Sequence, residues 1–241
     1  MKSGGADQLM RMQFYLCLLL IAQFCGASYS QSGSSVRLIS GKTPVGFESE
    51  INDFLRQDSI SFPPSGTYLF TGSSTIRKWN NLKTDFAEIT VIQRGFGGST
   101  IEALNFYVNH IVLPYRPKTI IVYEGDNDLA QGTSPNEFIS LCDTFISKVH
   151  KQLPKTMIYF MSIKPSFARK QQLLLQEEAN NQLTKLTQKR KRTDFIDIRQ
   201  LMYNREGKLR TDFFESDSLH VNSECYRVWA AYMKIKIGIT K

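Results

Sequence analysis

Serine, histidine and aspartate residues that could form a catalytic nucleophile lie near opposite ends of this chain. Ser73 and Ser74 follow Gly72 where an apolar run ends, and Asp217 precedes His220 by three residues. An aspartate that holds one imidazole nitrogen leaves the other nitrogen to accept a proton from a serine hydroxyl. Each motif alone also has a structural interpretation, because such serines often cap helices and such aspartates often close turns.

His220 is the candidate base among the three histidines of the sequence. His110 stands beside Ile111 and Val112 within a predicted helix, which favours a packed or surface position. His150 stands near the end of another predicted helix, where the helix dipole stabilises a positive charge. His220 alone lies in a predicted loop with an aspartate shortly before it.

Two further loops carry residues that can donate hydrogen bonds. Gly98 belongs to the glycine-rich segment 94–100, and Asn127 belongs to the tetrapeptide Gly-Asp-Asn-Asp at 125–128. A glycine lets its backbone N–H approach a substrate closely, and an asparagine amide donates a hydrogen bond without carrying a charge.

The elements that would position these residues alternate between strands and helices. Apolar runs predict strands at Tyr68–Thr71, Ile89–Ile92, Thr119–Tyr123, Met157–Ile163 and Phe195–Ile198, and amphipathic patterns predict helices at 47–55, 76–82, 100–112, 135–152, 167–190 and 223–235. In the 167–190 helix, Leu173 and Leu174 are expected on or near the apolar face. The alternation predicts an α/β fold with a five-stranded, mostly parallel sheet and helices on both faces. Ser74, Gly98 and Asn127 each follow the carboxyl end of a strand, where such sheets bind ligands.

The four motifs, taken together, resemble those of a known enzyme family. Gly72-Ser73-Ser74, Gly98, the tetrapeptide 125–128 and Asp217-Ser218-Leu219-His220 occur in the order and spacing of the SGNH hydrolases, also called GDSL-type esterases and lipases. The resemblance implies a three-layer α/β/α, flavodoxin-like fold and hydrolysis of carboxylic esters without a metal or another cofactor. By position, it also implies that Ser74 is the nucleophile, His220 the base and Asp217 its orienting acid. The resemblance further implies that Gly98 and Asn127 form the oxyanion hole together with the backbone N–H of Ser74.

Two positions depart from the pattern of that family. Ser73 stands where aspartate is frequent, which leaves Ser73 as an alternative nucleophile, although Ser74 matches the position of the family's nucleophile. Ser99 also replaces an aspartate that many relatives carry, and its expected role is to cap the helix at 100–112.

Other kinds of site find little support in the sequence. The G-x-S-x-G elbow of α/β-hydrolases is absent, the 95–100 segment has Thr100 in place of a third glycine, and no GK[ST] phosphate loop occurs. Glu124, Asp126 and Asp128 could suggest a hard-cation site. Alternation along an extended loop would scatter these carboxylates, so we expect no metal.

The first 30 residues have the pattern of a secretory signal peptide. A basic start precedes an apolar run of about a dozen residues, shorter than the ~20 of a membrane-spanning helix. Small residues then place the cleavage site near Ala27–Ser30, and Met10 or Met12 could be the true start in place of Met1. We therefore expect a secreted or periplasmic protein with no integral membrane span, the alternative being an uncleaved N-terminal membrane anchor.

Composition favours one soluble domain after this leader. The chain has 241 residues, 41% hydrophobic and 22% charged, with a formal net charge of +8. The densest basic run, Lys189–Arg192, ends a predicted helix, so a solvated helix end is favoured over a nucleic-acid site. Cys142 and Cys225 follow the leader and could form one disulfide or remain two buried thiols.

These observations give a domain organisation and two functional hypotheses. Residues 1–30 are the expected signal peptide, 31–66 an N-terminal segment with a short helix, and 67–241 the SGNH hydrolase domain. The first hypothesis is a secreted serine esterase acting on small acyl esters, lysophospholipids or O-acetylated sugars. The second is a catalytically silent module of the same fold that binds carbohydrate or lipid. Substrate-facing candidates near the rim are Arg77, Trp79, Arg94, Phe96 and Tyr123, for which packing and surface charge are the alternatives.

Overall fold

Five short strands form a parallel sheet. In the computed structural model, which describes residues 46–239, the strands are β1 (Tyr68–Gly72), β2 (Val91–Gly95), β3 (Thr119–Tyr123), β4 (Met157–Met161) and β5 (Thr193–Ile196). They are ordered β2-β1-β3-β4-β5, and all neighbouring strands run parallel. This is the flavodoxin-like order, so the fold class predicted from the sequence is confirmed.

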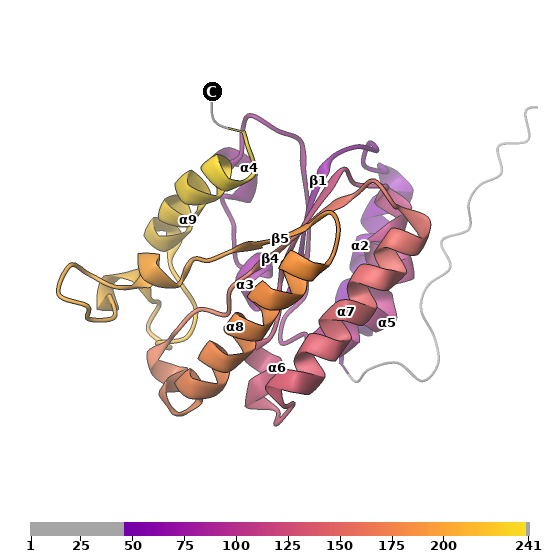
Figure 1. Cartoon of the computed structure of the whole chain (residues 1–241). Coiled ribbons are helices and arrows are strands. Elements are labelled where there is room, and N and C mark those ends of the chain that lie inside the picture. The colour runs from indigo at the N-terminus through magenta and orange to yellow at the C-terminus, as the bar shows by residue number, and fades with distance from the viewer. Residues whose placement is uncertain (1–45, 240–241) are drawn as a thin grey trace, which may run out of the picture. The chain divides into compact units, whose positions relative to one another are not determined.

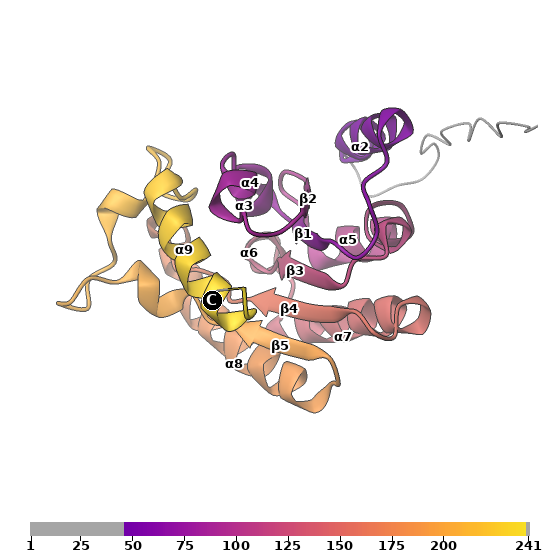
Figure 2. The ribbon, with the colours of Figure 1, turned by 90° about the horizontal axis from the view of Figure 1, so that it is seen from above.

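Helices cover both faces of the sheet (Figures 1 and 2). One face carries α2 (Glu48–Ile60), α5 (Ile101–Ile111), α7 (Pro135–Gln152) and α8 (Leu173–Lys189). The other face carries α3 (Ser74–Arg77), α4 (Leu82–Asp85) and α9 (Ser223–Lys236). The connections include α6 (Asp126–Ala130) and the 3₁₀ turns η1 (Leu113–Tyr115), η2 (Phe167–Gln172), η3 (Arg199–Met202) and η4 (Thr211–Phe213).

Each strand supplies side chains to two separate cores, because successive residues point to opposite faces of a sheet. Leu69 packs in the core beneath α5 and α7, whereas Phe70 packs against Trp79 on the opposite face. Both side chains are fully buried. This alternation sets the register that pairs Gly72 with Gly95 and brings the ends of β1, β2 and β3 to one rim.

Two loop-forming asparagines divide a segment that the sequence pattern predicts as one helix. The expected 76–82 helix is instead two single turns, α3 and α4, because Asn80 and Asn81 lie between them and favour turn conformations. The glycine-rich loop also starts later than expected, because β2 continues to Gly95.

The expected helix at 167–190 likewise begins in a different form. Its first residues form η2, in which Arg169 has a non-helical φ of −112°, and regular helix begins only at Leu173. The backbone N–H of Ala168 donates to the carbonyl of Ser218 at 3.2 Å, so this segment is tied to a distant loop. The expectation for Leu173 and Leu174 is also wrong, since they are 36% and 81% exposed.

The helix predicted at 47–55 is α2, which continues to Ile60 and is anchored by a buried ion pair. Asp58 accepts hydrogen bonds from the guanidinium of Arg94 and, at 2.5 Å, from the hydroxyl of Tyr115. Arg94 therefore joins α2 to β2 and does not face the rim. Residues 1–45 lie outside the described part of the chain, so the signal peptide and its cleavage site stay predictions.

Cys142 and Cys225 are buried free thiols, which decides between the two alternatives left by the sequence. Within residues 46–239, no helix has the length and apolar character needed to span a bilayer.

Candidate active site

Gly72 turns the chain at the end of β1 and so places the two serines. Its φ is 123°, and a Cβ at this position would lie 2.1 Å from the carbonyl oxygen of Tyr123, so a side chain cannot be accommodated. Ser73 follows as the N-cap of α3 and donates its backbone N–H to the same carbonyl at 3.0 Å. Ser74 is the first residue of α3, and its backbone N–H therefore has no acceptor within the helix.

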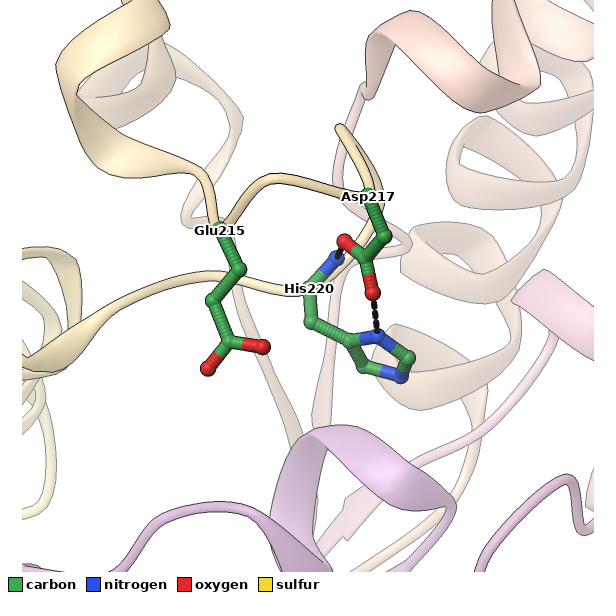
Figure 3. Close-up of side chains that lie close together, drawn as sticks. All are labelled: Glu215, Asp217 and His220. Carbon is green, nitrogen blue, oxygen red and sulfur yellow. Dashed lines mark hydrogen bonds and ion pairs between the residues drawn. The ribbon is translucent and has the colours of Figure 1, made fainter.

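Asp217 holds His220 in one orientation within the loop between η4 and α9. One carboxylate oxygen of Asp217 accepts the backbone N–H groups of Leu219 and His220 at 3.0 and 2.9 Å. The other oxygen lies 2.5 Å from Nδ1 of the His220 ring (Figure 3). The aspartate thus fixes both the backbone and the ring of the histidine.

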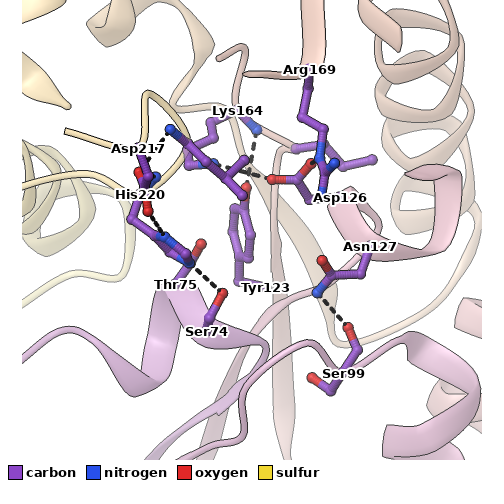
Figure 4. Close-up of polar contacts among 12 residues, drawn as sticks. Ser74, Thr75, Ser99, Tyr123, Asp126, Asn127, Lys164, Arg169, Asp217 and His220 are labelled. Atoms are coloured by element: carbon purple, nitrogen blue, oxygen red, sulfur yellow. Dashed lines mark hydrogen bonds and ion pairs between the residues drawn. The ribbon is translucent and has the colours of Figure 1, made fainter. Parts of the chain in front are cut away.

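The His220 ring joins this loop to Ser74, which is 146 residues away in the sequence. Nε2 of His220 lies 2.9 Å from Oγ of Ser74 (Figure 4). With Nδ1 protonated towards Asp217, Nε2 is the acceptor for the serine hydroxyl proton. Ser73 is only 2% exposed and, within the described residues, has no hydrogen bond to His220. The geometry thus favours Ser74 over Ser73 as the attacking group.

Two contacts between distant segments keep the serine turn and the histidine loop together. Lys78, which follows α3, donates to Glu215 in the histidine loop at 2.7 Å. Tyr226 of α9 donates its hydroxyl to the carbonyl of Thr75 at 2.7 Å, and its ring stacks on Trp79. The distance between Ser74 and His220 therefore depends on packing between α3 and α9 as well as on the loop itself.

Electrostatics favour an ionised Asp217. Partial burial opposes ionisation, but hydrogen bonds from the His220 ring and from the N–H groups of Leu219 and His220 outweigh it and lower the pKa of Asp217 well below its ordinary value. A carboxylate that stays ionised can stabilise a positive charge on the adjacent imidazole.

The two further predicted donors are Gly98, in the loop that follows β2, and Asn127, which lies across the site from Ser74 in Figure 4. Gly98 is exposed with a φ of 77°, and its N–H is unpaired within residues 46–239. Nothing lies within 4 Å of a Cβ built at Gly98, so the left-handed conformation, rather than space, calls for glycine here. Asn127 donates one amide hydrogen to the carbonyl of Ser99 at 2.9 Å, which leaves its second amide hydrogen for a ligand.

Ser99 ties the Gly98 and Asn127 loops together, a role that the sequence-based interpretation missed. Its hydroxyl donates to Glu124 at 2.7 Å, and its carbonyl accepts from Asn127. The expectation that Ser99 caps the following helix is wrong, since Thr100 is the N-cap of α5 and accepts the N–H of Ala103. Because Thr100 caps the helix, the side chain of Ser99 is free to turn inwards. The order of the two residues in the sequence does not show which of them is the cap.

Glu124, the partner of Ser99, is a buried carboxyl without a cation. It is 2% exposed, and its Oε2 has no hydrogen-bond partner within residues 46–239. Burial and repulsion from Asp128 raise the pKa of Glu124 well above its ordinary value, which favours the neutral form. The signal in the sequence was an acidic residue placed directly after the fully apolar run of β3.

We expect Glu124→Gln to keep the activity of the site and Glu124→Leu to lose part of it. Glutamine is neutral and can still accept the Ser99 hydroxyl, so kcat should stay within about threefold, whereas leucine leaves that hydroxyl unpaired. A displaced Asn127 loop should lower kcat by about 10- to 100-fold with little change in KM. Steady-state kinetics on an ester substrate, with thermal melting of each variant, would measure this. Full activity in both variants would show that Ser99 positions nothing through Glu124.

The acidic tetrapeptide region does not assemble a cation site. Glu124 points to Ser99, and Asp128 accepts the backbone N–H groups of Ile101 and Gly125, each at 2.9 Å. Asp126 instead pairs with Lys164 and Arg169 (Figure 4). These carboxylates therefore have separate partners. The expectation of an extended loop is wrong, because Asp126–Ala130 form the short helix α6.

A second acidic group, Glu215 with Asp217 and His220, has ligand atoms within 4.8 Å of one another (Figure 3). Both ring nitrogens of His220 already have partners, Asp217 and Ser74. Glu215 has its own cation in Lys78. The arrangement fits a proton-transfer chain better than a metal site.

The aromatic residues suggested as substrate-facing lie in the cores. Trp79, Phe96 and Tyr123 are fully buried, and the hydroxyl of Tyr123 accepts the backbone N–H of Lys164 at 3.4 Å. Arg77 is exposed and pairs with Glu50 of α2. The three aromatic residues therefore pack beneath the loops of the site, and Arg77 forms an ion pair on the surface.

Comparisons with known proteins bear on the family and the fold. The model of a family described as "GDSL-like Lipase/Acylhydrolase family" matches residues 58–228. No curated protein sequence matches the chain.

Several solved structures share the fold at low sequence identity. A protein from Streptococcus pneumoniae described as a platelet activating factor is 20% identical with a TM-score of 0.70, over 79% of this chain and 92% of that one. A GDSL-like lipase from Bacteroides thetaiotaomicron is 15% identical with a TM-score of 0.65, over 78% and 97%. A catalytic mutant of an acetylxylan esterase from Geobacillus stearothermophilus is 15% identical with a TM-score of 0.57, over 73% and 96%.

Proposed function

The chain belongs to the GDSL-like lipase/acylhydrolase family, and on this premise we propose that it is a serine esterase that hydrolyses carboxylic esters through Ser74, His220 and Asp217. The observation that carries the proposal is the continuous chain of hydrogen bonds from Ser74 Oγ to His220 Nε2 and from His220 Nδ1 to Asp217. These three groups come from two loops that meet only in the folded protein.

The reaction follows from the positions of these atoms. His220 Nε2 takes the hydroxyl proton of Ser74 as Oγ attacks the ester carbonyl carbon, and the ionised Asp217 stabilises the imidazolium. The alcohol leaves with that proton, and the acyl group stays on Oγ. A water molecule, deprotonated by His220, then attacks the acyl carbon and releases the carboxylic acid, which restores the serine hydroxyl.

The oxyanion formed in each step would meet the N–H groups of Ser74 and Gly98 and the amide of Asn127. These donors belong to α3, to the loop after β2 and to α6, which follows β3, so they are held in place before the substrate arrives.

We expect Asn127→Ala to lower kcat by about 10²–10³-fold, since one donor to the developing charge is lost. The KM should change little, because the oxyanion is present in the transition state and absent from the bound ester. Initial rates over a range of p-nitrophenyl acetate concentrations would separate the two constants. An unchanged kcat with a raised KM would contradict a role in the oxyanion hole.

The substrate classes that remain open are small acyl esters, lysophospholipids and O-acetylated sugars. The structural likeness to an acetylxylan esterase makes O-acetylated sugars a reasonable first choice. The chain itself is expected to reach such substrates outside the cytoplasm if residues 1–30 act as a signal peptide, which N-terminal sequencing of the exported protein would test.

An ester panel tests the proposed function. Wild type and Ser74→Ala would be assayed on p-nitrophenyl acetate, butyrate and octanoate, on a lysophospholipid and on acetylated xylan. We expect hydrolysis of at least one ester by wild type and none above background by the variant. If both proteins are equally inactive on every ester, the catalytically silent module is the better description.

A further inference from the structure

A cavity of about 450 Å³ lies between α8 and the segment 199–203 that follows β5. We call it the α8 cavity; its lining includes Ile163, Pro165, Gln176, Asn181, Arg199 and Tyr203. Amide, guanidinium and phenol groups thus share the wall with apolar side chains.

In the first turns of α8, a polar side chain is buried and apolar side chains are exposed, the reverse of the usual pattern of a helix that packs on a core. Gln176 points inwards and is 2% exposed, whereas Leu174 and Leu175 are 81% and 41% exposed. Neither polar atom of the Gln176 side chain has a hydrogen-bond partner within residues 46–239. A buried amide without partners destabilises a fold, and an apolar side chain of similar size would avoid that cost. The glutamine is therefore better explained by something that enters the cavity than by packing.

The charges around the α8 cavity favour a neutral ligand. The guanidinium of Arg199 is paired with both carboxylate oxygens of Asp197, at 2.8 and 2.6 Å. Glu177 also lines the cavity and adds a negative charge. A phosphate or carboxylate would find no unpaired cation there, whereas the hydroxyl groups of a sugar can both donate to and accept from amides. The ring of Tyr203 and the apolar Pro165 suit the less polar faces of such a ring.

The α8 cavity shares a wall with the candidate active site. Ile163 and Pro165 line the cavity, and Lys164 between them pairs with Asp126 at 3.1 Å. Asp126 directly precedes Asn127 in the sequence. Figure 4 shows the Lys164–Asp126 ion pair between the Asn127 and His220 side chains. The cavity follows β4 and β5 and Ser74 follows β1, so two to three strand spacings of ~4.8 Å, or about 10 to 14 Å, separate them along the rim. A ligand of two or three sugar rings would reach from one to the other.

We propose that the α8 cavity is a subsite for a neutral sugar ring of a saccharide ester whose acyl group lies at Ser74. This inference rests on the proposed esterase function and adds the class of alcohol that the enzyme accepts. In it, Gln176 and Asn181 recognise hydroxyl groups, and Tyr203 contacts the ring.

The test compares one ester that reaches the α8 cavity with one that does not. Wild type, Gln176→Leu and Asn181→Ala would be assayed on an O-acetylated xylotetraose and on p-nitrophenyl acetate, with Gln152→Leu, an exposed glutamine at the end of α7 outside the cavity, as the control. We expect both cavity variants to raise KM for the saccharide ester by about tenfold or more and to leave p-nitrophenyl acetate hydrolysis within about twofold. The control should match wild type on both esters.

A binding measurement gives a readout besides activity. Unacetylated xylotetraose titrated into Ser74→Ala should give saturable binding by calorimetry, and binding should be lost when Gln176→Leu is added. The melting temperature of Gln176→Leu should be equal to or above that of wild type, because an unpaired amide is removed. If Gln176→Leu fails to fold, Asn181→Ala, which changes an exposed side chain, carries the comparison.

The outcomes separate the two proposals. If wild type hydrolyses neither these two esters nor any ester of the panel above, the proposed function fails. If it hydrolyses p-nitrophenyl acetate or another ester of the panel but not the saccharide ester, or if the cavity variants change both esters equally or not at all, the proposed function stands and the subsite is overturned.

Discussion

Ser74→Ala is expected to lower kcat for p-nitrophenyl acetate by about 10⁶-fold, down to a residual rate from the oxyanion donors alone. The reason is geometric: Oγ of Ser74 is the one serine oxygen at hydrogen-bond distance, 2.9 Å, from Nε2 of His220 in the described part of the chain. The KM should stay within about threefold, because the methyl side chain leaves the pocket otherwise unchanged. Initial rates of the purified variant would measure this. The variant should be expressed and purified separately, on columns never used for wild type, so that no wild-type enzyme contaminates it.

Ser73→Ala is the matched control for that substitution. Ser73 is buried at the N-cap of α3, and its side chain makes no capping hydrogen bond. Its loss should leave kcat within about tenfold. If Ser73→Ala is the inactive variant and Ser74→Ala is active, the assignment of the nucleophile is wrong.

Asp217→Asn is expected to lower kcat by about 10⁴-fold while the protein stays folded. An asparagine amide that turns its N–H groups to the ring would favour the tautomer with a proton on Nε2, which cannot accept the proton of Ser74. It would also remove the negative charge that stabilises the imidazolium. Kinetics combined with a circular dichroism spectrum would distinguish loss of catalysis from loss of structure.

The pH dependence gives this prediction a second readout. The hydrogen bonds that lower the pKa of Asp217 keep it ionised from neutral to mildly acidic pH. Protonation of Asp217 should therefore not limit wild-type kcat between about pH 6 and pH 9. The stability that the lowered pKa contributes should be present above its ordinary pKa of 3.8 and disappear as the pH falls below it. An Asp217 carboxyl that takes up its proton within the neutral range, measured by NMR titration, would contradict this.

The central strands and the rim of the fold were predictable because their signals are local. The run Thr119–Tyr123 is apolar throughout and forms β3 with the same bounds. Ser134 caps α7 by accepting the N–H of Glu137, as the Ser-Pro-x-Glu pattern indicates. Glycines at the strand ends marked the turns that carry Ser74, Gly98 and Asn127.

The parts that could not be predicted depend on contacts between distant residues. Nothing near Ser99 in the sequence indicates that its hydroxyl turns to Glu124 and not to the helix that follows. The 3₁₀ form of η2 depends on a backbone hydrogen bond from Ala168 to Ser218, fifty residues later. A helical apolar pattern likewise gave no sign that Leu174 lies outside and Gln176 inside, because both positions fit an amphipathic helix with a slightly rotated face.

Covalent labelling with a fluorophosphonate tests the central claim most directly, because it reports the activated serine without any choice of substrate. Wild type, Ser74→Ala and Ser73→Ala would be labelled at neutral pH, and the modified peptide would be identified by mass spectrometry. The proposed Ser74–His220–Asp217 arrangement predicts a single label on Ser74 in wild type and in Ser73→Ala, and none in Ser74→Ala. A label on Ser73, or no label on a folded wild-type protein, would contradict it.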